Sequence, residues 1–153
     1  MQLRKLVKND LNSLVSLYSH LHQNDPKVPQ DYLELTWDKS EKCGCITYWG
    51  LFESEVLISS CQCIFVPNLT RGCQPYCLIE NVVTHKDYRT RGYGKALLKH
   101  ALDAAWLAGC YKVMLMTGRQ GQDVFNFYKS VGFDDKEKHA FVAKPKLSTK
   151  KEL

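Results

Sequence analysis

The chain has 153 residues, of which 44% are hydrophobic and 24% are charged, and this balance excludes a disordered or fibrous protein. The formal net charge of +5 is small and no basic stripe is interleaved with aromatic residues, so a nucleic acid is not an expected partner. No apolar run reaches the roughly 20 residues of a membrane span, and an odd number of cysteines without a visible signal peptide favours a reduced, cytoplasmic protein.

The chain begins with the patterns of a short strand and two helices. Residues 2–7 read as the strand, and Asn9 or Asp10 then stands where a helix N-cap belongs. Leucines follow at helical spacing until Pro26 ends the helix. A second helix is expected over 31–39.

Three segments rich in β-branched, aromatic and cysteine residues come next, at 46–52, 55–66 and 76–84. Turn-prone residues separate them, so we expect an antiparallel meander. Cys61 and Cys63 have C-x-C spacing, which places both on one face of a strand. Because zinc sites prefer a wider spacing, buried thiols are favoured here and no metal is expected.

Helix and strand patterns alternate in the last part of the chain. The expected elements are a helix from Gly92 to a C-cap at Gly109, a strand over 112–117, a helix over 123–130 ended by Gly132, and a last strand over 138–143. The order is therefore β-α-α-β-β-β-α-β-α-β. Without a repeat or a linker, this is one domain over 1–143, followed by a Lys-rich tail over 144–153.

The strongest signal for function is a strand, a loop and a helix between residues 76 and 98. Gly92 and Gly94 let the backbone approach a ligand, and the free N–H groups of a helix N-terminus attract anions such as phosphate. Arg89, Arg91 and Lys95 add positive charge. The alternative is a helix start that uses glycine only for tight packing.

Two motifs together point to a family. Arg-x-x-Gly-x-Gly at 89–94, between a strand and a long helix, is followed one strand later by Phe127-Tyr128-x-x-x-Gly132-Phe133. The combination resembles the GCN5-related N-acetyltransferase (GNAT) family. The resemblance implies an α/β (α+β) fold with a mixed, mostly antiparallel sheet flanked by helices, and an enzyme that uses acetyl-CoA as cosubstrate.

The resemblance also implies where acetyl-CoA binds. The backbone of Val82, Val83 and Thr84 would pair with the pantetheine arm as a surrogate strand. The loop that would hold the pyrophosphate consists of Arg89, Thr90, Arg91, Gly92, Tyr93, Gly94 and Lys95. A β-bulge near Asn81 or Val82 would offer a free N–H to the thioester carbonyl. Asn126 would substitute for a family asparagine, because Gly121 or Gln122 stands in its place.

Tyr128 matches the family tyrosine that protonates the departing CoA sulfur. A thiolate with a pKa near 8.5 can take a proton from a nearby phenol with a pKa near 10, although the transfer is slightly uphill. The alternative is a core tyrosine, since Phe125, Phe127 and Phe133 form an aromatic cluster around it in the sequence.

Glu80 is the second catalytic candidate, as the one acidic residue of an otherwise apolar strand. It would take a proton from a substrate ammonium, directly or through water. Its alternatives are a salt bridge or a substrate contact without proton transfer. Strand alternation places Glu80 on the face of Val82 and Thr84, opposite Asn81 and Val83, unless the bulge intervenes.

These residues predict direct acetyl transfer to a small-molecule primary amine, without a covalent enzyme intermediate. A cysteine nucleophile, with Cys77 or Cys110 beside His85 or His139, is a rival chemistry that no motif supports. A non-catalytic module that senses acyl-CoA is the rival class of function.

Two short stretches of sequence narrow the range of acceptors to consider. Residues 79–83 and 109–112 look like those of glucosamine-6-phosphate N-acetyltransferases, and Arg71 with Arg119 could meet a phosphate. Arg71 is equally well explained as a solvated turn residue. Exposed strand edges make a homodimer plausible.

Overall fold

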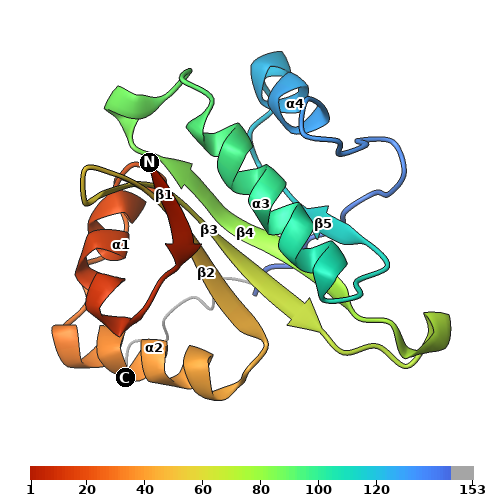
Figure 1. Cartoon of the computed structure of the whole chain (residues 1–153), viewed down its shortest axis with the longest axis horizontal. Helices are drawn as coiled ribbons and strands as arrows, with labels where there is room; N and C mark the ends of the chain where they lie inside the picture. The colour runs from red at the N-terminus through yellow and green to blue at the C-terminus, as the bar shows by residue number, and fades with distance from the viewer. Residues whose placement is uncertain (146–153) are drawn as a thin grey trace, which may run out of the picture.

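A computed structural model describes residues 1–145 of the chain. One sheet has the strand order β1-β2-β3-β4-β5, in which only β4 and β5 are parallel (Figure 1). The strands are β1 (Gln2–Lys5), β2 (Ile46–Glu53), β3 (Val56–Val66), β4 (Tyr76–Thr84) and β5 (Val113–Leu115). The helices are α1 (Leu11–Tyr18), α2 (Gln30–Lys42), α3 (Tyr93–Leu107) and α4 (Gln122–Lys129), with 3-10 turns η1 (Lys8–Asp10), η2 (Arg71–Cys73) and η3 (Lys86–Tyr88).

Helices cover both faces of the sheet and define two cores (Figure 1). On one face α3 buries Leu97, Leu98 and Ala101 against the sheet. On the other face α1 buries leucines spaced three apart, and Trp37 of α2 joins them. Each fully buried leucine contributes about 1.5–3 kcal/mol, so these stripes fix both helices on the sheet. Within residues 1–145, no helix has both the length and the apolar character to cross a bilayer.

Most of the expected elements are confirmed, with shifted ends. The meander differs from its predicted bounds by no more than one residue, and Gly109 and Gly132 end α3 and α4 with left-handed backbone. The first helix begins at Leu11, directly after the predicted N-cap, but it ends at Tyr18 and does not continue toward Pro26. Asp10 does not cap α1 with its side chain; its carboxylate binds Arg4 at 2.7 and 2.8 Å and accepts the Val7 N–H at 2.9 Å.

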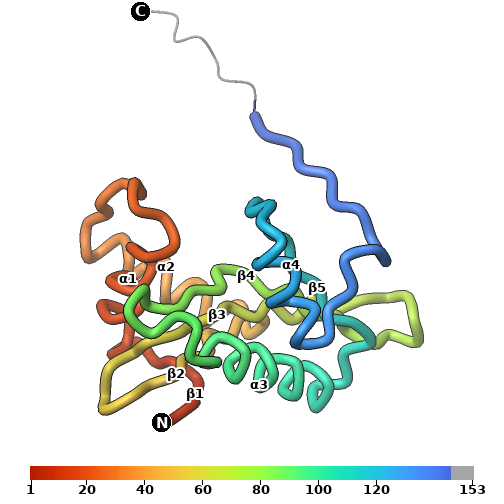
Figure 2. The backbone as a smooth tube through the Cα atoms, turned by 90° about the horizontal axis from the view of Figure 1, so that it is seen from above, coloured from red at the N-terminus to blue at the C-terminus, as the bar shows by residue number. Residues whose placement is uncertain are grey.

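The prediction of a last strand over 138–143 is wrong for the structure described. These residues have no regular structure and lead away from the sheet (Figure 2). A strand requires a partner, and within residues 1–145 this segment has none. Of the tail predicted over 144–153, residues 146–153 lie outside the described part of the chain.

Candidate active site

A β-bulge interrupts β4 at its midpoint. Ser60 of β3 pairs with Val83, whereas Gln62 pairs with Glu80, so two residues of β4, Asn81 and Val82, lie opposite a single residue of β3. Asn81 has a φ of 52°, in the left-handed region that asparagine tolerates better than most residues. The bulge thus consists of Asn81 and Val82, the two residues near which it was predicted from the sequence.

The bulge changes which side chains share a face. Before it Ile79 packs in the core under α3, and after it Val82 contacts that same core while Val83 is buried under α1 and α2. Glu80, next to Ile79, therefore faces the α1 and α2 side together with Val83. The predicted grouping of Glu80 with Val82 and Thr84 applies only to a strand without a bulge. The bulge does intervene, and its extra residue places Val82 on the opposite face from Glu80.

Beyond the bulge, one edge of β4 is open. The pairing of β4 with β5 ends at Ile79 and Leu115, and within residues 1–145 no strand continues along that edge to Thr84. The N–H of His85 donates to β3, so alternation turns the backbone of Val82 and Thr84 toward the open edge. Val83 instead directs its carbonyl to β3, where Ser59 Oγ donates to it at 2.8 Å. The open edge can therefore receive an extended ligand mainly at Val82 and Thr84.

The loop before α3 has the backbone geometry of an anion site. Thr90 and Gly92 both have left-handed φ angles, of 63° and 83°, on either side of Arg91. The first helical hydrogen bond runs from Ala96 N to Gly92 O at 3.0 Å, and no side chain caps the helix. The N–H groups of residues 93–95 thus have no partner in the helix, and together with its dipole they attract an anion.

Gly94, at the start of α3, lies close to both β4 and α4. A Cβ atom at this position would lie 3.2 Å from Thr84 Oγ1 at the end of β4 and 3.3 Å from Phe127 Cζ in α4. Gly92, in contrast, has open space around it and is required by its backbone angle. Tight packing thus accounts for one glycine of the motif, and the shape of the loop for the other.

The basic side chains of the loop differ in their contacts. Arg89 donates to the carbonyls of Thr84 at 3.1 Å and His20 at 3.0 Å, and so ties the loop to the chain after α1. The Arg91 guanidinium lies 5.4 Å from the centre of the Tyr88 ring. The structure therefore gives Arg89 a bracing contact that the sequence did not suggest.

The Tyr128 side chain lies half-buried between Phe127 and Phe133, with ring centres 5.1 and 6.1 Å away. Within residues 1–145 its hydroxyl has no hydrogen bond. Burial raises the pKa of this phenol, Arg119 opposes the increase, and Glu80 adds to it. Tyr128 is thus both part of the predicted aromatic cluster and electrostatically coupled to the other catalytic candidate.

Glu80 has polar neighbours that sequence reasoning missed. Gln62, its partner on β3, accepts a hydrogen bond from Asn81 Nδ2 at 3.1 Å and lies 3.5 Å from the Tyr48 hydroxyl. Beside them the hydroxyl of Tyr18 is buried, which raises the pKa of that phenol. Glu80 itself forms no salt bridge within the described residues, which removes one alternative to a role at the site. Only the cross-strand register, which the sequence does not give, brings these groups together.

Three other predicted contacts are placed as follows. Asn126 is exposed on α4 and accepts a hydrogen bond from Gln122 Nε2 at 2.9 Å. Arg71 lies 6.0 Å from the ring of Tyr111, ahead of β5, whereas Arg119 follows β5 on the side of Tyr128. The two arginines therefore stand at opposite ends of β5, and Arg119 is the one whose charge acts on Tyr128.

The cysteine-histidine alternative receives no support. Cys77 and Cys110 are buried in the core under α3. The neighbouring Cys63 and burial raise the pKa of the Cys77 thiol, and burial raises the pKa of the Cys110 thiol. His85 instead packs on His20, with ring centres 4.1 Å apart, and His139 lies in the exposed terminal segment. A thiol that resists ionisation and has no adjacent base is a poor nucleophile.

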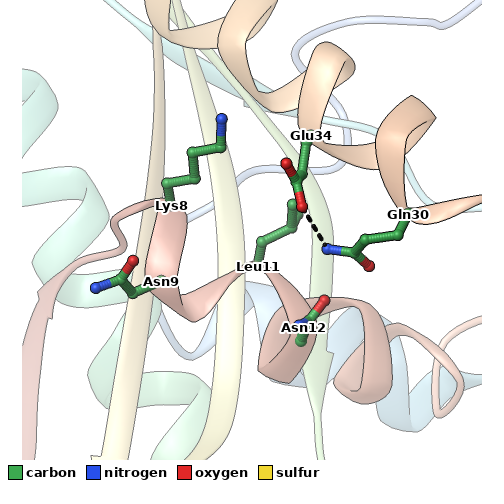
Figure 3. A pocket seen from close by; sticks show the side chains of 6 residues that line it. All are labelled: Lys8, Asn9, Leu11, Asn12, Gln30 and Glu34. Carbon is green, nitrogen blue, oxygen red and sulfur yellow. Dashed lines mark hydrogen bonds between the residues drawn. The ribbon is translucent and has the colours of Figure 1, made fainter.

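An open pocket of about 360 Å³ lies elsewhere, between η1, α1 and α2 (Figure 3). Gln30 Nε2 donates to Glu34 Oε1 there at 3.0 Å. Its lining residues are Lys8, Asn9, Leu11, Asn12, Gln30 and Glu34. None of the predicted binding or catalytic residues lines this pocket, so it is separate from the candidate site.

Comparisons with known proteins agree with this geometry. The acetyltransferase (GNAT) family model matches residues 11–133. The chain is 29% identical, over 134 residues, to a glucosamine 6-phosphate N-acetyltransferase of Trypanosoma brucei brucei, covering 87% of this chain and 88% of that one. A solved protein structure from Agrobacterium tumefaciens has a TM-score of 0.89 and 35% identity, covering 94% of this chain and 100% of that one. An acetyltransferase of Trypanosoma brucei has a TM-score of 0.78 and 26% identity, covering 94% and 99%. Since the family model spans most of its length, the chain belongs to the acetyltransferase (GNAT) family.

Proposed function

We propose that this protein transfers the acetyl group of acetyl-CoA to the primary amine of a small molecule. One observation supports the proposal: the bulge and the open edge of β4 lie between Glu80, whose charge acts on the Tyr128 phenol, and the loop before α3, whose free N–H groups suit an anion. A long ligand with a pyrophosphate at one end and a thioester at the other fits this arrangement. The backbone of Val82 and Thr84 would hold its middle part.

The loop residues fit the pyrophosphate on physical grounds. The free N–H groups of residues 93–95 and the left-handed residues of the loop favour an anion, and Lys95 adds charge. Arg89 would contribute mainly by fixing the loop, since two carbonyls already hold its side chain. Asn126 would contact the cosubstrate through its amide nitrogen. A side chain in place of Gly94 would disturb this cradle.

The chemistry is direct transfer between amine and thioester. The amine nitrogen attacks the carbonyl carbon, a C–N bond forms, and the C–S bond to CoA breaks. Glu80, directly or through a water, would accept the proton that the nitrogen loses, and Tyr128 would give a proton to the departing sulfur. Its raised pKa keeps Tyr128 in the donor form at neutral pH. The N–H at the bulge would stabilise the carbonyl oxygen as it becomes negative.

We propose an amino sugar phosphate as the first acceptor to test. The relative from Trypanosoma brucei brucei is named for glucosamine 6-phosphate, and the charge of Arg119 acts on the Tyr128 phenol, so a phosphate would find a cation on that side of the site. Glu80 faces the α1 and α2 side, so the acceptor would approach from that side. Gln62 and Tyr48 would supply hydrogen bonds to its hydroxyl groups.

The test is the release of free CoA with a panel of amines that includes glucosamine 6-phosphate, glucosamine, polyamines and lysine peptides. We expect turnover with the phosphorylated amino sugar and a loss of kcat of at least a hundredfold in Glu80→Gln or Tyr128→Phe. The control variant Tyr32→Phe changes an exposed tyrosine of α2 and should be as active as the wild type. Binding of acetyl-CoA without any turnover would instead support the sensor function.

Failure to bind acetyl-CoA would refute the proposal itself. A ligand at 100 times its Kd stabilises a protein by about 2.7 kcal/mol, which gives a shift of several degrees in Tm. If millimolar acetyl-CoA leaves the Tm unchanged, the assignment of the loop is wrong.

A further inference from the structure

The last residue of α1 buries a polar atom on the side of the sheet that Glu80 faces. Tyr18 packs its ring against the core under α1 and α2, and its hydroxyl is buried without a partner of standard hydrogen-bond geometry within residues 1–145. A buried hydroxyl without a partner is costly, because water no longer satisfies its donor and acceptor positions. A phenylalanine would fill the same space without this cost, so packing alone does not explain the hydroxyl.

Asn81, at the bulge of β4, has a donor to spare. The NH2 group of an asparagine carries two hydrogens, and one of them is directed to Gln62 Oε1, with 3.1 Å between the heavy atoms. Burial, and after it Tyr48 and Cys61, raise the pKa of the Tyr18 phenol, whereas the side chain of Asn81 lowers it. An amide lowers the pKa of a phenol when it directs an N–H to the phenol oxygen, because that bond favours the charged form. The Asn81 amide and the Tyr18 oxygen are therefore neighbours.

We propose that Tyr18 is a positioning residue, whose oxygen takes the second hydrogen of the Asn81 amide and so fixes the bulge from the α1 side. Gln62 takes the first hydrogen from the β3 side, so the amide is held between two elements. The side chain of Asn81 begins at the Cα whose φ of 52° shapes the bulge. Fixing that side chain therefore also fixes the direction of the bulge N–H. Tyr18 needs no contact with either substrate, because it acts through Asn81.

The chain after α1 is tied to the candidate site at a second point. The carbonyl of His20 accepts a hydrogen bond from Arg89, in the loop before α3, at 3.0 Å. The carbonyl of Tyr18 accepts the N–H of His22 at 3.0 Å, which keeps this segment compact. One short segment would thus hold both the bulge and the loop, which the proposed function assigns to the thioester and the pyrophosphate. In its catalytic consequence, the role of Tyr18 rests on that proposed function.

The first test is thermal unfolding of the full chain without a ligand. Tyr18→Phe removes only the hydroxyl and should lower the Tm by a few degrees, the effect of one lost hydrogen bond. Asn81→Gly removes the group through which Tyr18 acts, so adding Tyr18→Phe to Asn81→Gly should leave the Tm unchanged or raise it. Tyr32→Phe is the matched control: it removes the hydroxyl of an exposed tyrosine and should lower the Tm in neither background.

The second test is kinetic and separates positioning from packing. Tyr18→Phe should lower kcat roughly threefold and leave KM for acetyl-CoA unchanged, and this loss should vanish in the Asn81→Gly background. The proposal is overturned if Tyr18→Phe keeps the full kcat, or if its effects on Tm and kcat are the same in both backgrounds. If the wild type acetylates no amine, the proposed function fails, and the coupling in Tm alone decides the proposal: its presence supports the contact with Asn81, and its absence overturns it.

Discussion

The side chain of Asn81 should decide whether the bulge of β4 forms. Its φ of 52° is costly for most residues, and its amide donates to Gln62 Oε1 at 3.1 Å. The two contributions can be separated by substitution. Asn81→Gly removes the hydrogen bond but accepts the left-handed angle, whereas Asn81→Ala removes both advantages.

The magnitudes follow from these two losses. A left-handed angle costs alanine roughly 1 kcal/mol more than asparagine, and the lost hydrogen bond costs about 1 kcal/mol. Asn81→Ala should therefore lower the free energy of unfolding by about 2 kcal/mol, which is roughly 4–8 °C in Tm. Asn81→Gly should lose about 1 kcal/mol, and Gln62→Ala, which removes only the partner of the amide, should lose a similar amount.

Thermal unfolding and steady-state kinetics test this order. If the bulge N–H acts on the thioester carbonyl, kcat should fall more than tenfold in Asn81→Ala and only a few-fold in Asn81→Gly. KM for acetyl-CoA should change less than kcat in both. The reasoning is refuted if alanine is tolerated as well as glycine, because the left-handed backbone would then need no special residue.

Three further predictions concern pH and packing. The raised pKa of Tyr128 means that its proton stays on as the pH rises, so kcat should show no alkaline loss due to this group below about pH 10. A decrease in kcat near pH 8–9 that is absent in Tyr128→Phe would contradict this prediction. Gly94→Val should weaken acetyl-CoA binding at least tenfold, measured by calorimetry, because Thr84 Oγ1 would lie 3.2 Å from the new Cβ; unchanged affinity would exclude this contact. Arg4 lowers the pKa of Asp10. Their ion pair therefore stabilises the fold at pH values above the ordinary pKa of aspartate, and this stabilisation is lost as the pH falls through the lowered pKa. Asp10→Asn should thus cost about 1 kcal/mol at pH 7 and progressively less as the pH falls through the lowered pKa of Asp10, and a cost that does not change with pH would exclude the ion pair.

Local patterns predicted most of the fold because the local signals and the packing agree. The strands of the meander combine β-branched side chains with turn residues, and α3 has an uninterrupted apolar stripe between Gly92 and Gly109. The loop before α3 could be predicted for the same reason, since two glycines and a helix start occur together in eight residues. Signals of this kind need no knowledge of distant contacts.

Cross-strand contacts explain what the sequence did not predict. The position of the bulge depends on how β4 pairs with β3, and the hydrogen bond from Asn81 to Gln62 joins residues 19 positions apart. The contact of Arg89 with His20 spans 69 positions. The last strand was expected over 138–143 from its residue types alone, but a strand also requires a neighbour to pair with.

The bulge links the two halves of the proposed reaction. By reversing the alternation of β4, it leaves Glu80 on the face covered by α1 and α2, while Val82 contacts the α3 core and turns its backbone toward the open edge. An acceptor held near Glu80 and a thioester held along that edge would then meet at Asn81 from different directions. A regular strand would place Glu80 on the face of Val82, in the core under α3, where no acceptor could reach it. In the proposed reaction, this one-residue insertion in β4 would thus separate the two substrates and direct both toward one backbone N–H.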